Sequence, residues 1–171
     1  KSSSDSQKNL SIKKKKIRLF IAGIGAVGGT LTKLIQELNH DLYDLRIIGV
    51  CNSSFTKWNP DVDAFLEDRK LSQGEPTDWN VIPDQLINQS DGNLVFVDAT
   101  GSEVVAHQYQ HLLTHGVHIA TPSKRANTFG QDYFNHLIKA NDSGRAQYRY
   151  ETAVGAGLPV ISTIKTLLNS G

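Results

Sequence analysis

A glycine-rich turn between an apolar run and an amphipathic segment constrains the fold of this chain more than any other feature. Residues 17–22 are almost continuously apolar, which is typical of a strand buried on both faces. Gly-Ile-Gly-Ala-Val-Gly follows at 23–28, and apolar residues then recur at helical spacing over 31–38. A second apolar run at 45–50 completes a strand–turn–helix–strand unit, whose two strands we expect to be parallel.

The rest of the chain continues this alternation of strands and helices. Strands are predicted at 93–98, 117–120 and 146–150, and helices at 62–70, 82–88, 104–114 and 129–140. Such alternation favours an α/β fold of Rossmann type, with a doubly wound, mostly parallel sheet and helices on both faces. We expect this domain to span 17–150, after a Ser- and Lys-rich lead-in or linker at 1–16 that we predict to be disordered.

The glycine turn predicts a site for the phosphates of a dinucleotide. Gly23 permits the tight bend, Gly25 lets a pyrophosphate approach the backbone, and Gly28 allows the helix to pack closely on the strand. The amides and the positive dipole at the helix N-terminus, where Ala26 and Val27 lie, favour the negative charge of the phosphates. A tight turn without a ligand is the alternative, but the strand before the motif and the helix after it favour dinucleotide binding.

The end of the second predicted strand bears on the choice of cofactor. NAD-preferring sites usually place Asp or Glu here, where it binds the ribose hydroxyls. In this chain Asn52 and Ser53 follow the strand, Lys57 is nearby, and the first carboxylate is Asp61. Because neutral donors and a cation can accept a 2′-phosphate, the sequence predicts NADP or NAD, with NADP preferred. Cys51, at the strand end, is interpreted as a small core residue rather than a nucleophile.

Three further segments, taken with the glycine turn, carry a family resemblance. They read Val-Asp-Ala-Thr at 97–100, Ala-Thr-Pro-Ser-Lys-Arg-Ala-Asn at 120–127 and Tyr-Glu-Thr-Ala-Val-Gly-Ala-Gly-Leu-Pro at 150–159. In this order and spacing the chain over 17–171 resembles the N-terminal, NAD(P)-binding part of homoserine dehydrogenase, either free-standing or fused to an aspartokinase. The resemblance implies NAD(P)-dependent interconversion of L-homoserine and L-aspartate 4-semialdehyde, a step towards threonine, methionine and isoleucine. It implies a cytoplasmic protein, or a plastid protein in a plant.

The same resemblance assigns roles to residues near the nicotinamide. Lys124 matches the lysine of the family's Thr-Pro-Asn-Lys segment, where an ammonium could donate a hydrogen bond to the developing alkoxide. Thr100 matches a residue near the nicotinamide ribose. The chain departs from the family pattern at Ser123, where Asn is common, and at Gly101, where Ser is often found.

Residues 151–171 resemble the family's monovalent-cation loop and the start of its catalytic and dimerisation region. There Glu151 and the backbone carbonyls of Val154, Ala156 and Leu158 would ligate Na⁺. Hard oxygen ligands with a single carboxylate suit such a weakly charged ion. A glycine-rich connection into a helix is the alternative. The family's substrate-binding carboxylates and second catalytic lysine come later, so we expect this chain alone to bind dinucleotide with negligible turnover, and the complete enzyme to be a homo-oligomer.

Charge and composition narrow the range of partners. Six Lys and one Asp give residues 1–16 a charge of +5, so with a net charge of +1 the remainder carries −4. This balance argues against a nucleic-acid binder, and no apolar run reaches the roughly 18 residues that a membrane span requires. A single cysteine excludes a multi-cysteine metal site within the chain.

Three alternatives use other features of the sequence. His107, His111 and His115 are spaced for one helical face and could bind zinc or nickel, but a solvent-facing stripe is the ordinary interpretation. A non-catalytic module that senses NAD(H) would carry the same glycine turn, although it has no evident need for Lys124 or the Glu151 loop. A methyltransferase would usually place an acidic residue at the end of the second strand, where this chain has none.

Overall fold

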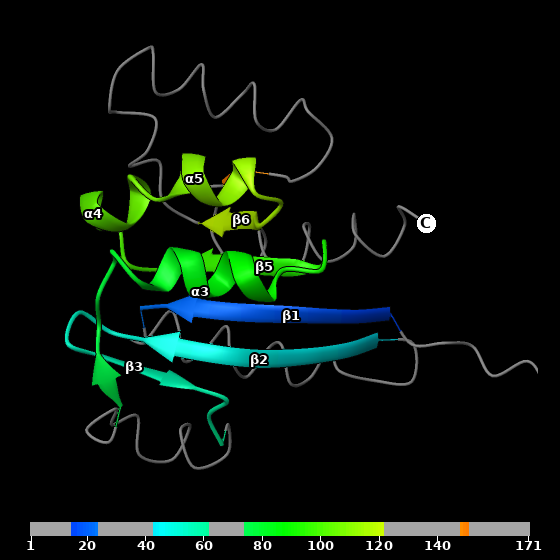
Figure 1. Cartoon of the computed structure of the whole chain (residues 1–171), viewed down its shortest axis with the longest axis horizontal. Helices are drawn as coiled ribbons and strands as arrows, with labels where there is room; N and C mark the ends of the chain where they lie inside the picture. Colours follow the sequence, from blue (N-terminus) through cyan, green and yellow to red (C-terminus); the bar gives the residue numbers. More distant parts are fainter. Residues whose placement is uncertain (1–14, 24–42, 62–73, 122–147, 151–171) are drawn as a thin grey trace, which may run out of the picture.

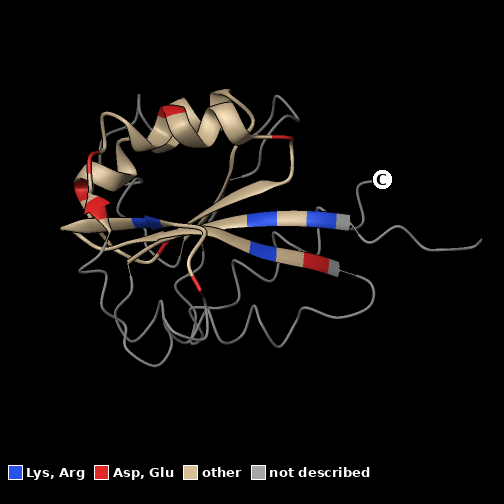
Figure 2. Ribbon diagram, turned by 60° about the horizontal axis from the view of Figure 1, so that its bottom comes forward, with Lys and Arg blue, Asp and Glu red and all other residues tan. Residues whose placement is uncertain are grey.

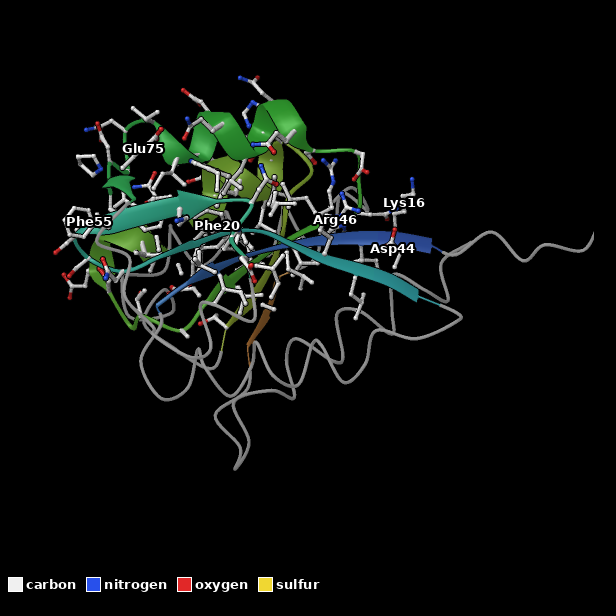
Figure 3. All side chains as sticks on the ribbon, turned by 90° about the horizontal axis from the view of Figure 1, so that it is seen from below. Lys16, Phe20, Asp44, Arg46, Phe55 and Glu75 are labelled. Carbon is white, nitrogen blue, oxygen red and sulfur yellow. The ribbon has the colours of Figure 1, made fainter. Side chains whose placement is uncertain are left out.

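The computed structural model describes residues 15–23, 43–61, 74–121 and 148–150. Its strands are β1 (Lys15–Ala22), β2 (Tyr43–Cys51), β3 (Phe55–Trp58), β4 (Glu75–Pro76), β5 (Leu94–Asp98), β6 (His118–Thr121) and β7 (Tyr148–Tyr150). Its helices are α3 (Ile82–Gln89), α4 (Glu103–Ala106) and α5 (Tyr109–Thr114). The described helices lie on one side of the sheet (Figures 2 and 3). The helices predicted at 31–38, 62–70 and 129–140 fall outside the described residues.

All the described strands join one sheet in the order β4-β3-β2-β1-β5-β6-β7 (Figure 1). From β2 to β7 through β1, β5 and β6, every neighbouring pair is parallel. The chain leaves β1 for β2 on one side and later returns to β5 on the other, so the strand order reverses beside β1. Ligands of open α/β sheets bind at the carboxyl ends of the strands at such a reversal. The predicted Rossmann-type, mostly parallel sheet is therefore confirmed.

The antiparallel edge formed by β3 and β4 was absent from the sequence-based prediction. β3 folds back on β2, with Cys51 opposite Thr56 and Gly49 opposite Trp58, and β4 pairs antiparallel with β3. These strands have only four and two residues, too few to show a periodicity. The Asn52 side chain specifies the turn between β2 and β3, because its Oδ1 accepts the amides of Ser54 at 2.8 Å and Phe55 at 2.6 Å.

One predicted helix and the predicted lead-in also differ from the structure. The helix predicted at 104–114 is interrupted between α4 and α5, where the Gln108 amide bonds to the Val105 carbonyl three residues back and breaks the α-helical pattern. β1 begins at Lys15, paired with Tyr43, so the last two residues of the expected disordered lead-in at 1–16 belong to a strand. The helix predicted at 82–88 is confirmed as α3, with proline in its first turn.

An aromatic cluster fills the space between the sheet and the described helices. The Phe20 ring, at the middle of the sheet (Figure 3), stacks on Phe96 with ring centroids 5.7 Å apart and lies 5.2 Å from the Trp58 ring. On β2, a Cβ at Gly49 would lie 2.5 Å from the Phe20 ring, so only glycine fits beneath it. Leu86 of α3 and Leu112 of α5 are fully buried against the same cluster. This packing fixes the carboxyl ends of β1, β2 and β5 relative to one another.

Charged side chains mark the opposite end of the sheet. Lys16, Asp44 and Arg46 lie on the amino-terminal halves of β1 and β2, far from Phe55 and Glu75 at the other end (Figure 3). The site described below lies at the other end of the sheet, at the carboxyl ends of β1, β2 and β5.

Candidate functional site

Gly23 closes the carboxyl end of β1 in a conformation that requires glycine. Its φ is +93°, and a Cβ there would lie 3.0 Å from the Ala99 carbonyl carbon and 3.1 Å from Thr100 Cγ2. Backbone hydrogen bonds hold this point on both sides, from the Gly23 amide to the Cys51 carbonyl and from the Ala99 amide to the Ala22 carbonyl, both at 2.8 Å. Glycine is therefore required at position 23, where the sequence predicts the start of the tight bend. Gly25, Ala26, Val27 and Gly28 lie outside the described residues.

Thr100 lies next to Gly23 at this edge, in the turn that follows β5. Its hydroxyl donates to Asp98 Oδ1 at 2.5 Å, its amide donates to the same oxygen at 2.8 Å, and the Ser102 amide donates to its Oγ1 at 3.0 Å. Gly101, between them, has a φ of +63°. Thr100 is exposed to solvent. Its hydrogen bonds to Asp98 and Ser102 nevertheless fix the orientation of its side chain.

Asp98 is a buried carboxylate at the centre of this arrangement, and sequence reasoning gave it no role. It is 1% exposed, and its Oδ2 accepts a short hydrogen bond from the hydroxyl of Tyr109, a buried residue of α5. Burial raises the pKa of the Asp98 carboxyl, and the hydrogen bonds from Thr100 and Tyr109 offset this only in part. One signal was available: a carboxylate that ends an otherwise apolar strand needs buried donors.

Thr121 links the end of β6 to the same point. It is fully buried, and its hydroxyl donates to the Asp98 carbonyl at 2.8 Å. Thr121 is three residues before Lys124, the predicted catalytic residue, which itself lies outside the described residues. The end of β6 and the turn after β5 are therefore fixed to each other just before the chain reaches that lysine.

The hairpin after β2 presents the residues predicted to recognise the ribose. Asn52 is half-buried and its amide oxygen is committed to the turn, whereas Ser53 and Ser54 are exposed. The Asn52 carbonyl accepts the Thr77 hydroxyl at 3.0 Å, which attaches the turn to the segment after β4. The Asn52 amide nitrogen can only donate. This hairpin thus offers hydroxyl and amide groups rather than a carboxylate.

Cys51 is a core residue, as the sequence predicts. It is 1% exposed, and burial raises the pKa of its thiol to about 12. A backbone hydrogen bond at Gly23 lowers that pKa, and the negative charge of Asp98 raises it. Since the thiolate is the reactive form, the burial and the raised pKa both disfavour Cys51 as a nucleophile.

The three spaced histidines lie on the surface near α5. His111 Nε2 lies 3.1 Å from Asp84 Oδ1, and His115 Nδ1 lies 2.8 Å from the His111 carbonyl. Within the described ranges, no group of three or more His, Cys, Asp or Glu side chains could hold a metal ion. The predicted sodium ligands Glu151, Val154, Ala156 and Leu158 lie outside those ranges.

A cavity of about 370 Å³ opens between β3, β4 and the start of α3. It is lined by Thr56, Trp58, Glu75, Pro76, Asp78, Val81, Ile82 and Gln85, and it contains none of the residues predicted from the sequence to form a site.

In the part of the chain that the structure describes, no helix is long and apolar enough to cross a membrane.

The parallel core, the reversal of strand order beside β1 and the glycine bend define a domain of the Rossmann class. The pattern of the family "Homoserine dehydrogenase, NAD binding domain" matches residues 23–151. This chain belongs to that family. The match does not favour the alternative of a regulatory module without chemistry.

Individual relatives agree with this assignment. The chain is 34% identical to the bifunctional aspartokinase/homoserine dehydrogenase of Haemophilus influenzae, over 92% of this chain and 20% of that protein. It is 28% identical to homoserine dehydrogenase of Schizosaccharomyces pombe, over 95% of this chain and 45% of that protein. A hyperthermophilic archaeal homoserine dehydrogenase solved in complex with NADPH superimposes with a TM-score of 0.63 and 25% identity, covering 86% of this chain and 47% of that structure. The chain thus spans about a fifth to a half of these relatives.

Proposed function

We propose that this chain binds NADP(H) or NAD(H) at the carboxyl edge of β1, β2 and β5, as the cofactor part of an enzyme that interconverts L-homoserine and L-aspartate 4-semialdehyde. The main support is the Gly23 bend, which leaves no room for a Cβ between the end of β1 and the Ala99–Thr100 turn. The first glycine of such a motif makes the tight turn, and the next glycine lets the backbone approach the pyrophosphate. Gly23, Gly25, Ala26, Val27 and Gly28 would hold the pyrophosphate.

NADP is the preferred cofactor in this proposal. The hairpin of Asn52 and Ser53 carries amide and hydroxyl donors, and Lys57 on β3 adds a positive charge nearby. From 52 to 60 the sequence has no Asp or Glu that would repel a 2′-phosphate. An NAD-preferring site would instead use a carboxylate at this position to bind the free ribose hydroxyls.

The nicotinamide, when bound, supplies or accepts the hydride. The protein aligns the two carbons and stabilises the substrate oxygen. Lys124 would donate a hydrogen bond to that oxygen as it becomes an alkoxide, and Thr100 would lie at the nicotinamide ribose. The Thr121 bond to the Asp98 carbonyl supports this role, because it fixes the start of the segment that leads to Lys124.

Further parts of the proposal concern regions beyond the described residues. Glu151 and the carbonyls of Val154, Ala156 and Leu158 would bind Na⁺, and the complete protein would act as a homo-oligomer in the cytoplasm, or in the plastid of a plant. The reaction would serve the synthesis of threonine, methionine and isoleucine. Alone, residues 1–171 would bind the dinucleotide but turn over no substrate.

Fluorescence titration and a turnover assay test the proposal together. NADPH is titrated into the 171-residue chain and into the complete protein, and NADPH oxidation is then followed with L-aspartate 4-semialdehyde. We expect saturable NADPH binding by both proteins and turnover only by the complete protein. Absence of saturable binding by both would overturn the proposal, and rapid turnover by the 171-residue chain would contradict its last part.

A further inference from the structure

Both carboxylate oxygens of Asp98 have donors inside the protein. Oδ1 accepts the amide and the hydroxyl of Thr100, and Oδ2 accepts the hydroxyl of Tyr109. Asp98 and Tyr109 are each 1% exposed, so neither can touch a ligand at the edge of the sheet. Only Thr100 of this trio is exposed. Among the hydrogen bonds of the two side chains given above, those to Thr100 connect the buried pair to an exposed residue.

The hydrogen bonds of Thr100 determine what it can offer to a ligand. A threonine has one amide hydrogen, one hydroxyl hydrogen and two lone pairs on the hydroxyl oxygen. Asp98 takes both hydrogens, at 2.8 Å and 2.5 Å, and the Ser102 amide takes one lone pair at 3.0 Å. The residue is left with acceptors alone: its carbonyl and the second hydroxyl lone pair. Such a surface suits the O–H of a sugar and disfavours a phosphate oxygen, which accepts hydrogen bonds itself.

We propose that Asp98, held by Tyr109, is a positioning residue that makes the hydroxyl oxygen of Thr100 an acceptor for a ribose hydroxyl of the nicotinamide half of the cofactor. The inference rests on the proposed function, which places the dinucleotide at this edge. It adds that two parts of the carboxyl edge offer different hydrogen-bonding groups to the cofactor. The glycine turn supplies donors for the phosphates, whereas the turn after β5 supplies acceptors for the sugar.

Tyr109→Phe tests the proposal, because it removes one hydroxyl group that is buried and cannot touch the cofactor. With one donor lost, the carboxylate shifts and Thr100 loses its fixed orientation. We expect the dissociation constant for NADPH to rise about three- to tenfold, the effect of one net hydrogen bond. Adenosine 2′,5′-bisphosphate, which lacks the nicotinamide half, should bind the variant and the wild type equally. A merely structural role for Tyr109 would not separate these two ligands.

Leu112→Val is the matched control, since Leu112 is fully buried on the same helix and contacts the core rather than the carboxylate. It should lower the melting temperature without changing the ratio of the two dissociation constants. Tyr109→Phe should also have little further effect on NADPH binding in a Thr100→Val background, because the hydroxyl through which it acts is already gone. All measurements use the complete protein, with the melting temperature recorded for each variant.

Three results would overturn the inference. Tyr109→Phe could leave NADPH binding within twofold of wild type, it could weaken both ligands equally, or its effect could persist fully in the Thr100→Val background. In each case the wild type still binds NADPH, so the proposed function stands. Failure of the wild type to bind either ligand would overturn the proposed function and this inference with it.

Discussion

The Gly23 amide donates to the Cys51 carbonyl at 2.8 Å and thereby ties the first residue of the glycine turn to the last residue of β2. Cys51 leads directly into the hairpin that carries Asn52 and Ser53. A single backbone hydrogen bond thus joins the proposed pyrophosphate site to the proposed ribose site. Any distortion at Gly23 is expected to reach both.

Gly23→Ala should damage both folding and dinucleotide binding. Alanine at a φ of +93° is strained by about 1–2 kcal/mol, and its Cβ would also press on Ala99 at 3.0 Å. Gly92→Ala is a matched control, since Gly92 has a φ of +90° but nothing within 4 Å of a Cβ. In urea unfolding, Gly23→Ala should therefore lose at least about 1 kcal/mol more than Gly92→Ala. Only Gly23→Ala should weaken NADPH binding, and equal losses would show that the close approach is unimportant.

The thiol of Cys51 should be inert in the native state. Its pKa of about 12 leaves almost no thiolate at pH 8, and the side chain is buried. Because the chain has one cysteine, a thiol reagent such as dithionitrobenzoate reports on this residue alone. We expect no release of the coloured product over an hour in buffer, and one equivalent after addition of denaturant. Rapid stoichiometric labelling in buffer would place Cys51 at the surface.

His118 should make the protein less stable in mild acid. Burial lowers the pKa of His118, while its hydrogen bond to the Gly92 carbonyl at 2.7 Å acts in the opposite direction. Since the unfolded chain then binds a proton at a higher pH than the folded one, stability falls as the pH drops below the ordinary histidine value of about 6.5. His118→Gln keeps a donor for Gly92 and should flatten this dependence. Urea midpoints at pH 7.5 and 5.5 measure it, and an unchanged slope in the variant would assign the effect to other groups.

Asn52→Asp should shift the cofactor preference towards NADH. The carboxylate can still accept the Ser54 and Phe55 amides, so the turn is kept, but it adds a negative charge where the 2′-phosphate would bind. We expect the ratio of the NADPH to the NADH dissociation constant to rise at least about tenfold, or about 1.4 kcal/mol. Asn93→Asp is the control, because it makes the same chemical change at the amino end of β5, away from the carboxyl edge of the sheet. It should leave the ratio of the two dissociation constants unaltered. No change with Asn52→Asp would move the 2′-phosphate site elsewhere.

Much of the parallel sheet is predictable because its signal is local. Apolar runs at 17–22, 45–50 and 93–98 appear as contiguous letters, and Gly23 follows the first of them directly. What escaped prediction depends on contacts between distant residues or on short segments. Nothing beside Asp98 in the sequence reveals that Tyr109 bonds to it, and β3 and β4 are too short to show a periodicity. Lys124 and the Glu151 loop remain predictions.

The short antiparallel strands affect how the edge of this sheet can associate with other copies of the protein. β4 ends the sheet with two exposed residues, Glu75 and Pro76. Pro76 has no amide hydrogen to donate, and burying the charged Glu75 beneath another strand is unfavourable. This edge strand is therefore a poor template for the addition of a strand from another molecule. The sheet is thus protected at β4 against edge-to-edge pairing with a strand of another molecule.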